Sequence, residues 1–84
     1  MLHGNRPNPF NPQTTIRFDV AESAYVKLVV YDVLGRQVRV LVDGQRAAGM
    51  HEAVFDESTL PSGTYLYRLD TPAGSFVGSM LVVK

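Results

Sequence analysis

Hydrophobic and polar residues alternate with a period of two along most of this chain. In the segment 14–20, Ile16, Phe18 and Val20 are separated by polar residues. Such alternation is typical of a β-strand that buries one face and exposes the other. Similar patterns predict strands in five further segments, which are residues 25–31, 37–42, 50–56, 64–70 and 75–83.

Turn-forming residues separate these segments. Asp32 and Gly35 hold the first and fourth positions of a tetrapeptide that suits a type I turn, with a positive φ at the glycine. Pro61 and Gly63 hold the second and fourth positions of another predicted turn, which begins at Leu60. A type I turn followed by a glycine with positive φ is a common hairpin connection, so we expect the turn at Asp32–Gly35 to join two antiparallel strands.

One predicted strand departs from strict alternation. Within the segment 37–42, Val40, Leu41 and Val42 are consecutive apolar residues, and a β-bulge near Leu41 would accommodate them. The residues that follow, 43–49, are small or polar, and we expect them to form a loop.

The first twelve residues are rich in asparagine and proline. Proline lacks an amide donor and fixes φ, so residues 1–12 are expected to be an extended lead-in from an upstream linker, with a short seventh strand as an alternative. The lead-in contains Asn8, Pro9, Phe10, Asn11 and Pro12, and we expect Phe10 to plug one end of the core.

Residues 13–84 then form a single domain. No window of eleven residues shows helical periodicity free of glycine or proline. Short strands at regular spacing predict an all-β fold, and an immunoglobulin-like antiparallel β-sandwich of about seven strands fits best.

Composition narrows the possible partners. The 84 residues include eight basic and eight acidic side chains, and zero net charge argues against nucleic acid as a partner. Without cysteine, the chain has no disulfides and no thiolate zinc site.

No segment approaches the roughly 20 apolar residues of a membrane helix, and no signal peptide is visible. We therefore expect this chain to be the tail of a longer protein.

The ionisable residues do not predict an enzyme. His51 has no second histidine at metal-ligand spacing, so a packed or rim histidine is the favoured interpretation. Asp56 and Glu57 are the only adjacent acidic pair, too few oxygen ligands for calcium, and a solvated turn is favoured. We expect no catalytic residues, metal site, cofactor or small-molecule substrate.

The tyrosines allow two interpretations. Tyr25, Tyr31, Tyr65 and Tyr67 could form an aromatic platform for sugars. Alternatively, Tyr65 and Tyr67 share one strand face with Leu69 and belong to the core, which is the favoured interpretation.

Four stretches, in order and at these spacings, resemble one known family. They are N-R-P-N-P-F-N-P from Asn5, T-T-I-R-F-D-V, V-Y-D-V-L-G-R-Q-V, and L-P-S-G-T-Y-L-Y-R-L followed by the terminal M-L-V-V-K. Together they resemble the C-terminal sorting domain (type A) of cargo of the type IX, or Por, secretion system of Bacteroidetes. The resemblance covers residues 5–84.

The resemblance implies a secretion signal rather than an enzyme. It implies recognition of a larger cargo protein by the type IX translocon and outer-membrane shuttle proteins, and cleavage by a sortase-like protease. The cargo would pass through the periplasm to the cell surface or the medium. The implied recognition residues are Pro61, Gly63 and Tyr65 of the P-x-G-x-Y motif and the closing residues Met80, Leu81, Val82, Val83 and Lys84. The alternative is an immunoglobulin-like structural or carbohydrate-binding accessory module.

Overall fold

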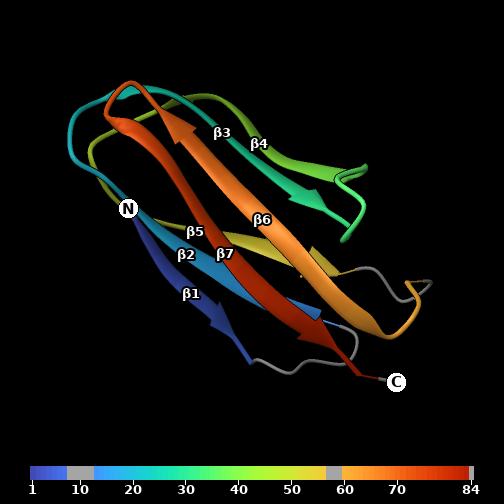
Figure 1. Cartoon of the computed structure of the whole chain (residues 1–84). Coiled ribbons are helices and arrows are strands. Elements are labelled where there is room, and N and C mark those ends of the chain that lie inside the picture. The colour runs from blue at the N-terminus through green and yellow to red at the C-terminus, as the bar shows by residue number, and fades with distance from the viewer. Residues whose placement is uncertain (8–12, 57–59, 84) are drawn as a thin grey trace.

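The chain folds into two antiparallel β-sheets that pack face to face (Figure 1). The computed structural model describes residues 1–7, 13–56 and 60–83, and these ranges contain seven strands and no helix. The predicted all-β sandwich of about seven strands is therefore confirmed. The expected lead-in residues Asn8, Pro9, Phe10, Asn11 and Pro12, and the terminal Lys84, lie outside the described residues.

The two sheets have different sizes. The three-stranded sheet has the order β1-β2-β5, and the four-stranded sheet has the order β4-β3-β6-β7. The bounds of the strands are β1 Leu2–Arg6, β2 Gln13–Val20, β3 Ala24–Tyr31, β4 Gln37–Arg46, β5 Gly49–Asp56, β6 Gly63–Thr71 and β7 Gly74–Val82.

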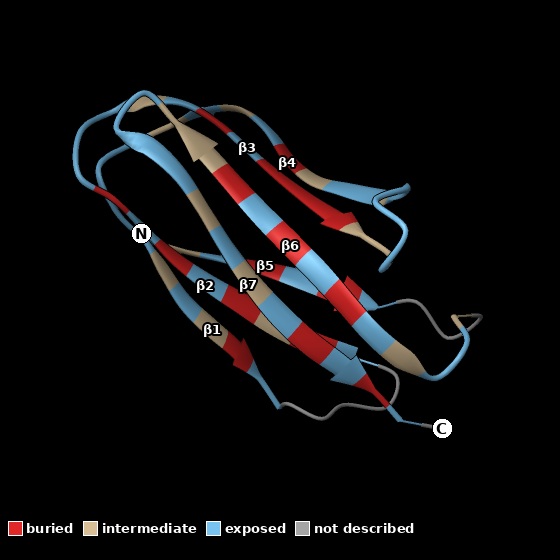
Figure 2. Cartoon of the chain, viewed as in Figure 1, coloured by how far each residue is buried: buried red, intermediate tan, exposed pale blue. Residues whose placement is uncertain are grey.

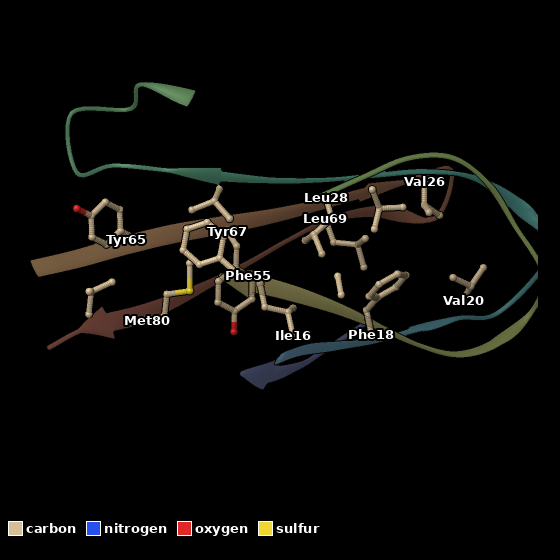
Figure 3. Close-up of a cluster of buried hydrophobic side chains, with 14 residues drawn as sticks. Ile16, Phe18, Val20, Val26, Leu28, Phe55, Tyr65, Tyr67, Leu69 and Met80 are labelled. Atoms are coloured by element: carbon tan, nitrogen blue, oxygen red, sulfur yellow. The ribbon is translucent and has the colours of Figure 1, made fainter. Parts of the chain in front are cut away.

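Alternate residues of the strands fill the space between the sheets. Figure 2 shows buried and exposed residues alternating along β2 and β6. In Figure 3, Ile16 and Phe18 from one sheet face Leu28 and Leu69 from the other. Burying each such side chain contributes about 1.5–3 kcal/mol, so this apolar layer is the main source of stability in a domain without disulfides.

Strand β4 is longer than the sequence pattern predicts. Residues 43–46, expected in a loop, continue the ladder with β3, in which Lys27 pairs with Asp43 and Ala24 pairs with Arg46. Polar side chains are tolerated there because β4 is an edge strand with one face toward solvent. The bulge predicted near Leu41 is confirmed, since Leu28 pairs with Val42 while its neighbour Val29 pairs with Val40.

The seventh strand is β1, which lies within the lead-in, as the alternative prediction had it, and ends at Arg6 in the Asn- and Pro-rich motif. It pairs with β2, and Asn5 lies opposite Ile16. The buried amide of Asn5 donates from Nδ2 to Thr14 Oγ1 at 3.1 Å and to the Pro7 carbonyl at 3.3 Å. Thr14 Oγ1 donates in turn to the Pro7 carbonyl at 2.8 Å. This closed hydrogen-bond cluster satisfies the buried polar groups that join β1 to β2.

Candidate functional site

The turn between β3 and β4 is built around one carboxylate. The Gly35 N–H donates to the Asp32 carbonyl at 3.0 Å, and Gly35 has a φ of +83°, so the predicted turn is confirmed. Asp32 Oδ1 accepts from the backbone N–H groups of Leu34 at 2.9 Å and Arg36 at 3.0 Å. The Arg36 side chain donates from Nε to Asp32 Oδ2 at 2.8 Å. These contacts, the Arg36 backbone N–H first among them, hold the pKa of Asp32 below its ordinary value.

This turn presents two apolar side chains to solvent. Val33 is 68% exposed and Leu34 is 75% exposed, although both occupy central positions of a turn, where polar residues are usual. Backbone preferences predict the turn but not the exposure of its side chains, so the sequence analysis does not include Val33 and Leu34 among the candidate site residues. The apolar residues at the turn centre were the signal that could have identified this pair.

The P-x-G-x-Y residues form a local unit at the start of β6. The Tyr65 hydroxyl donates to the Pro61 carbonyl at 2.8 Å, and the Tyr65 ring lies in the core. Gly63 has a φ of +149°, a conformation that residues with a side chain rarely adopt. Tyr65 therefore fixes the bend at Pro61, and Gly63 supplies the backbone geometry that the bend requires.

We predict that Gly63→Val destabilises the domain by about 1–3 kcal/mol, through backbone strain. A Cβ at this position would meet no atom within 4 Å, so steric overlap would not contribute to the loss. Thr64→Val, at the next and exposed position, is the matched control. Thermal unfolding followed by circular dichroism should show a lower Tm for Gly63→Val only; equal Tm values for the two variants would contradict the assignment.

The C-terminal strand β7 lies beside this unit. It pairs with β6, with Met80 opposite Tyr65 and Val82 opposite Gly63. Met80 and Val82 point into the core, each 2% exposed, whereas Leu81 and Val83 are each 43% exposed. Among the described strands, β7 is at one edge of the four-stranded sheet and pairs with β6.

These segments meet at one end of the sandwich, which we call the motif end. It comprises the β3–β4 turn, residues 60–63 and the C-terminal end of β7, and Figure 1 shows it away from the N-terminus. A shallow groove of about 240 Å³ lies between the first two segments. Its walls are Val33, Leu34 and Arg36 on one side and Leu60, Pro61 and Tyr65 on the other. The structure thus brings together Asp32, Pro61 and Tyr65, which are far apart in the sequence.

The tyrosines do not share a surface. Tyr65 and Tyr67 belong to the core, as the favoured interpretation predicted. Tyr25 is 56% exposed and contacts the Asp43 carboxylate, whereas the Tyr31 ring lies beneath the Arg68 guanidinium at 5.7 Å. Tyr25 and Tyr31 are six residues apart on one strand, about 20 Å, so they form no continuous platform for a sugar.

Ionisable residues are likewise dispersed over the structure. The ring of His51 stacks on Phe18 at 5.4 Å and its Nε2 lies 2.7 Å from the Ala47 carbonyl, as expected of a packed histidine. Among residues 1–7, 13–56 and 60–83, no three His, Asp or Glu side chains are grouped closely enough to hold a metal ion. Within the same ranges, no helix has the length and apolarity needed to cross a membrane.

Comparison with protein families connects these segments to a function. A family model described as the secretion system C-terminal sorting domain matches residues 6–84. The chain belongs to the family of type IX secretion C-terminal sorting domains. A search of curated proteins finds no match.

The sorting domain is a signal for export across the outer membrane by the type IX machinery. Its family is not known for catalysis. The family match begins at Arg6, the last residue of β1, so most of β1 lies before the matched region. The motif end, by contrast, lies wholly within it.

Proposed function

We propose that this sorting domain directs a larger cargo protein, joined at its N-terminal side, through the type IX translocon, and that the motif end is the surface recognised. The observation that carries the proposal is the convergence of three sequence motifs at one end of the sandwich. The residues in recognition roles are Pro61, Gly63, Tyr65, Met80, Leu81, Val82, Val83 and Lys84.

These residues divide into two groups by what their side chains contact. Tyr65, Met80 and Val82 are buried, so they act by holding the bend and β7 in place. Leu81 and Val83, with the exposed pair Val33 and Leu34, offer apolar contacts to a shuttle protein or to the translocon. Because hydrogen bonds already order the turn, binding costs less conformational entropy than ordering a flexible tail would.

After export, a sortase-like protease would separate cargo from the sorting domain, and the cargo would be attached to the cell surface or released.

The proposal is tested by export of a reporter. Residues 1–84 would be fused to the C-terminus of a periplasmic reporter in a bacterium with a functional type IX system. The same fusion in a translocon-null strain, and the reporter without the sorting domain, are the controls. We expect reporter outside the cell only when both the sorting domain and the translocon are present; retention in the periplasm of the competent strain would contradict the proposal.

A further inference from the structure

A second groove lies at the end of the sandwich opposite the motif end. It holds about 620 Å³ and is lined by residues of the β2–β3 loop and the β6–β7 turn. Figure 1 shows this loop and this turn at the same end of the sandwich. Val20 and Phe76 contribute apolar surface, and Pro72 and Ala73 line the turn side. Met1 also lines this groove, so the N-terminal end of the ladder between β1 and β2 lies at the edge of the groove.

The pairing of β1 with β2 is still complete at Met1. The Met1 nitrogen donates to the Asp19 carbonyl at 2.7 Å, and the Asp19 N–H donates to the Met1 carbonyl at 2.7 Å. Two residues that exchange both backbone hydrogen bonds form a regular pair of an antiparallel ladder. In a chain with a preceding residue, the Met1 nitrogen is an amide, which keeps its N–H for the same bond. A preceding residue would next lie beside Val20 and the loop 21–23.

We propose that the chain segment immediately before Met1, on the cargo side, continues β1 and lies in this groove. The inference rests on the proposed function, which places a cargo domain before the sorting domain. In the continued strand, successive side chains would point alternately into the groove and toward solvent. The linker would thus be ordered over its last few residues rather than joining the sandwich as a free tether.

The groove also restricts the chemistry of the segment that occupies it. Among its lining residues the charged side chains are two carboxylates, Asp19 and Glu22, and the remaining lining residues are apolar or small. Asp and Glu in the linker would be repelled, whereas neutral or basic residues with modest apolar side chains fit. We therefore expect a docked segment that is free of acidic residues.

This arrangement separates cargo from the recognised surface. The sandwich is 37 Å long, and its N-terminus lies toward the groove while its C-terminus lies toward the motif end (Figure 1). A docked linker would hold the cargo beyond the groove, on the far side from Leu34 and Val83. The cargo would then be attached at the end of the sandwich farthest from the motif end, which favours access to the motif end.

Hydrogen exchange in a protein that joins a cargo domain to the sorting domain at Met1 tests the proposal. Ala73→Trp places a bulky ring in the groove at an exposed position, and Leu34→Trp at the motif end is the matched control. The amides compared are those of the residues just before Met1 and those of residues 21–24. In the wild type and in Leu34→Trp, we expect them to exchange about ten times more slowly, or slower still, than in Ala73→Trp.

The proposal would be overturned if, in the wild type, the amides before Met1 exchanged as fast as those of an unstructured chain. This holds whatever the exchange rates in the two variants. Protection that Ala73→Trp leaves unchanged would also overturn it. The measurement is made in solution without the translocon, so a negative result here is distinct from failure of the export test.

Discussion

Gly78→Ala should lower the stability of the domain by about 1–3 kcal/mol, although it adds a single methyl group. Gly78 lies opposite Tyr67 in the β6–β7 ladder. A Cβ at residue 78 would stand 2.6 Å from Tyr67 Cε2 and closer still to Cζ and the hydroxyl oxygen. The Tyr67 ring is 2% exposed and packed in the core, so it cannot move aside without disturbing its neighbours.

The expected Tm decrease is about 4–8 °C for each kcal/mol, measured by thermal unfolding. Ser79→Ala, at the adjacent exposed position, should leave Tm nearly unchanged. In a Tyr67→Leu background, where the ring is absent, Gly78→Ala should cost far less, and the double-mutant cycle gives the coupling between the two positions. A loss of stability that is the same in both backgrounds would show that the ring is not the obstacle.

Loss of export is the second large effect we expect, from Leu81→Glu combined with Val83→Glu. Both side chains are exposed, so the fold should be retained while the apolar contacts proposed for β7 are replaced by charges that are costly to bury. Export of the reporter fusion should fall about tenfold or more, which corresponds to a loss of about 1.4 kcal/mol in recognition. The amount of reporter outside the cell measures the effect.

Deletion of residues 80–84 is a weaker test, because it also removes Met80 and Val82 from the core. Val77→Glu is the better control, since Val77 is 64% exposed on the same strand but nearer the opposite end. It should be exported normally. Wild-type export by the Leu81→Glu, Val83→Glu variant, with Tm unchanged, would show that the exposed face of β7 is not recognised.

Strands that bury one face have an alternating pattern, so they could be predicted from the sequence. Segments that become strands only through backbone pairing with a neighbouring strand could not be predicted in this way. Alternation identified β2 and β6 because burial against the opposite sheet selects every second residue. The end of β4, residues 43–46, was missed because its side chains are polar and only the ladder with β3 makes it a strand. Strand β1 has no alternating pattern, and its pairing depends on contacts such as that between Asn5 and Thr14.

The candidate site was also predictable from the sequence only in part. The turns at Asp32–Gly35 and at Pro61 follow from local chemistry, so the sequence was sufficient to predict them. Their proximity depends on the sheet order β4-β3-β6-β7, which is set by contacts distant in sequence. The role of Gly78 was also missed, although a glycine inside a strand is a signal that another group approaches closely.

The position of β7 at the end of the fold bears on quality control in the cell. Its side chains Met80 and Val82 complete the core, and its backbone completes the ladder with β6. Domains fold as their residues leave the ribosome, and β7 is the last of the seven described strands to emerge. A protein whose translation stops early would lack β7 and so could not display the export signal. We therefore expect the secretion route to accept proteins that carry a complete sorting domain and to leave truncated ones unexported.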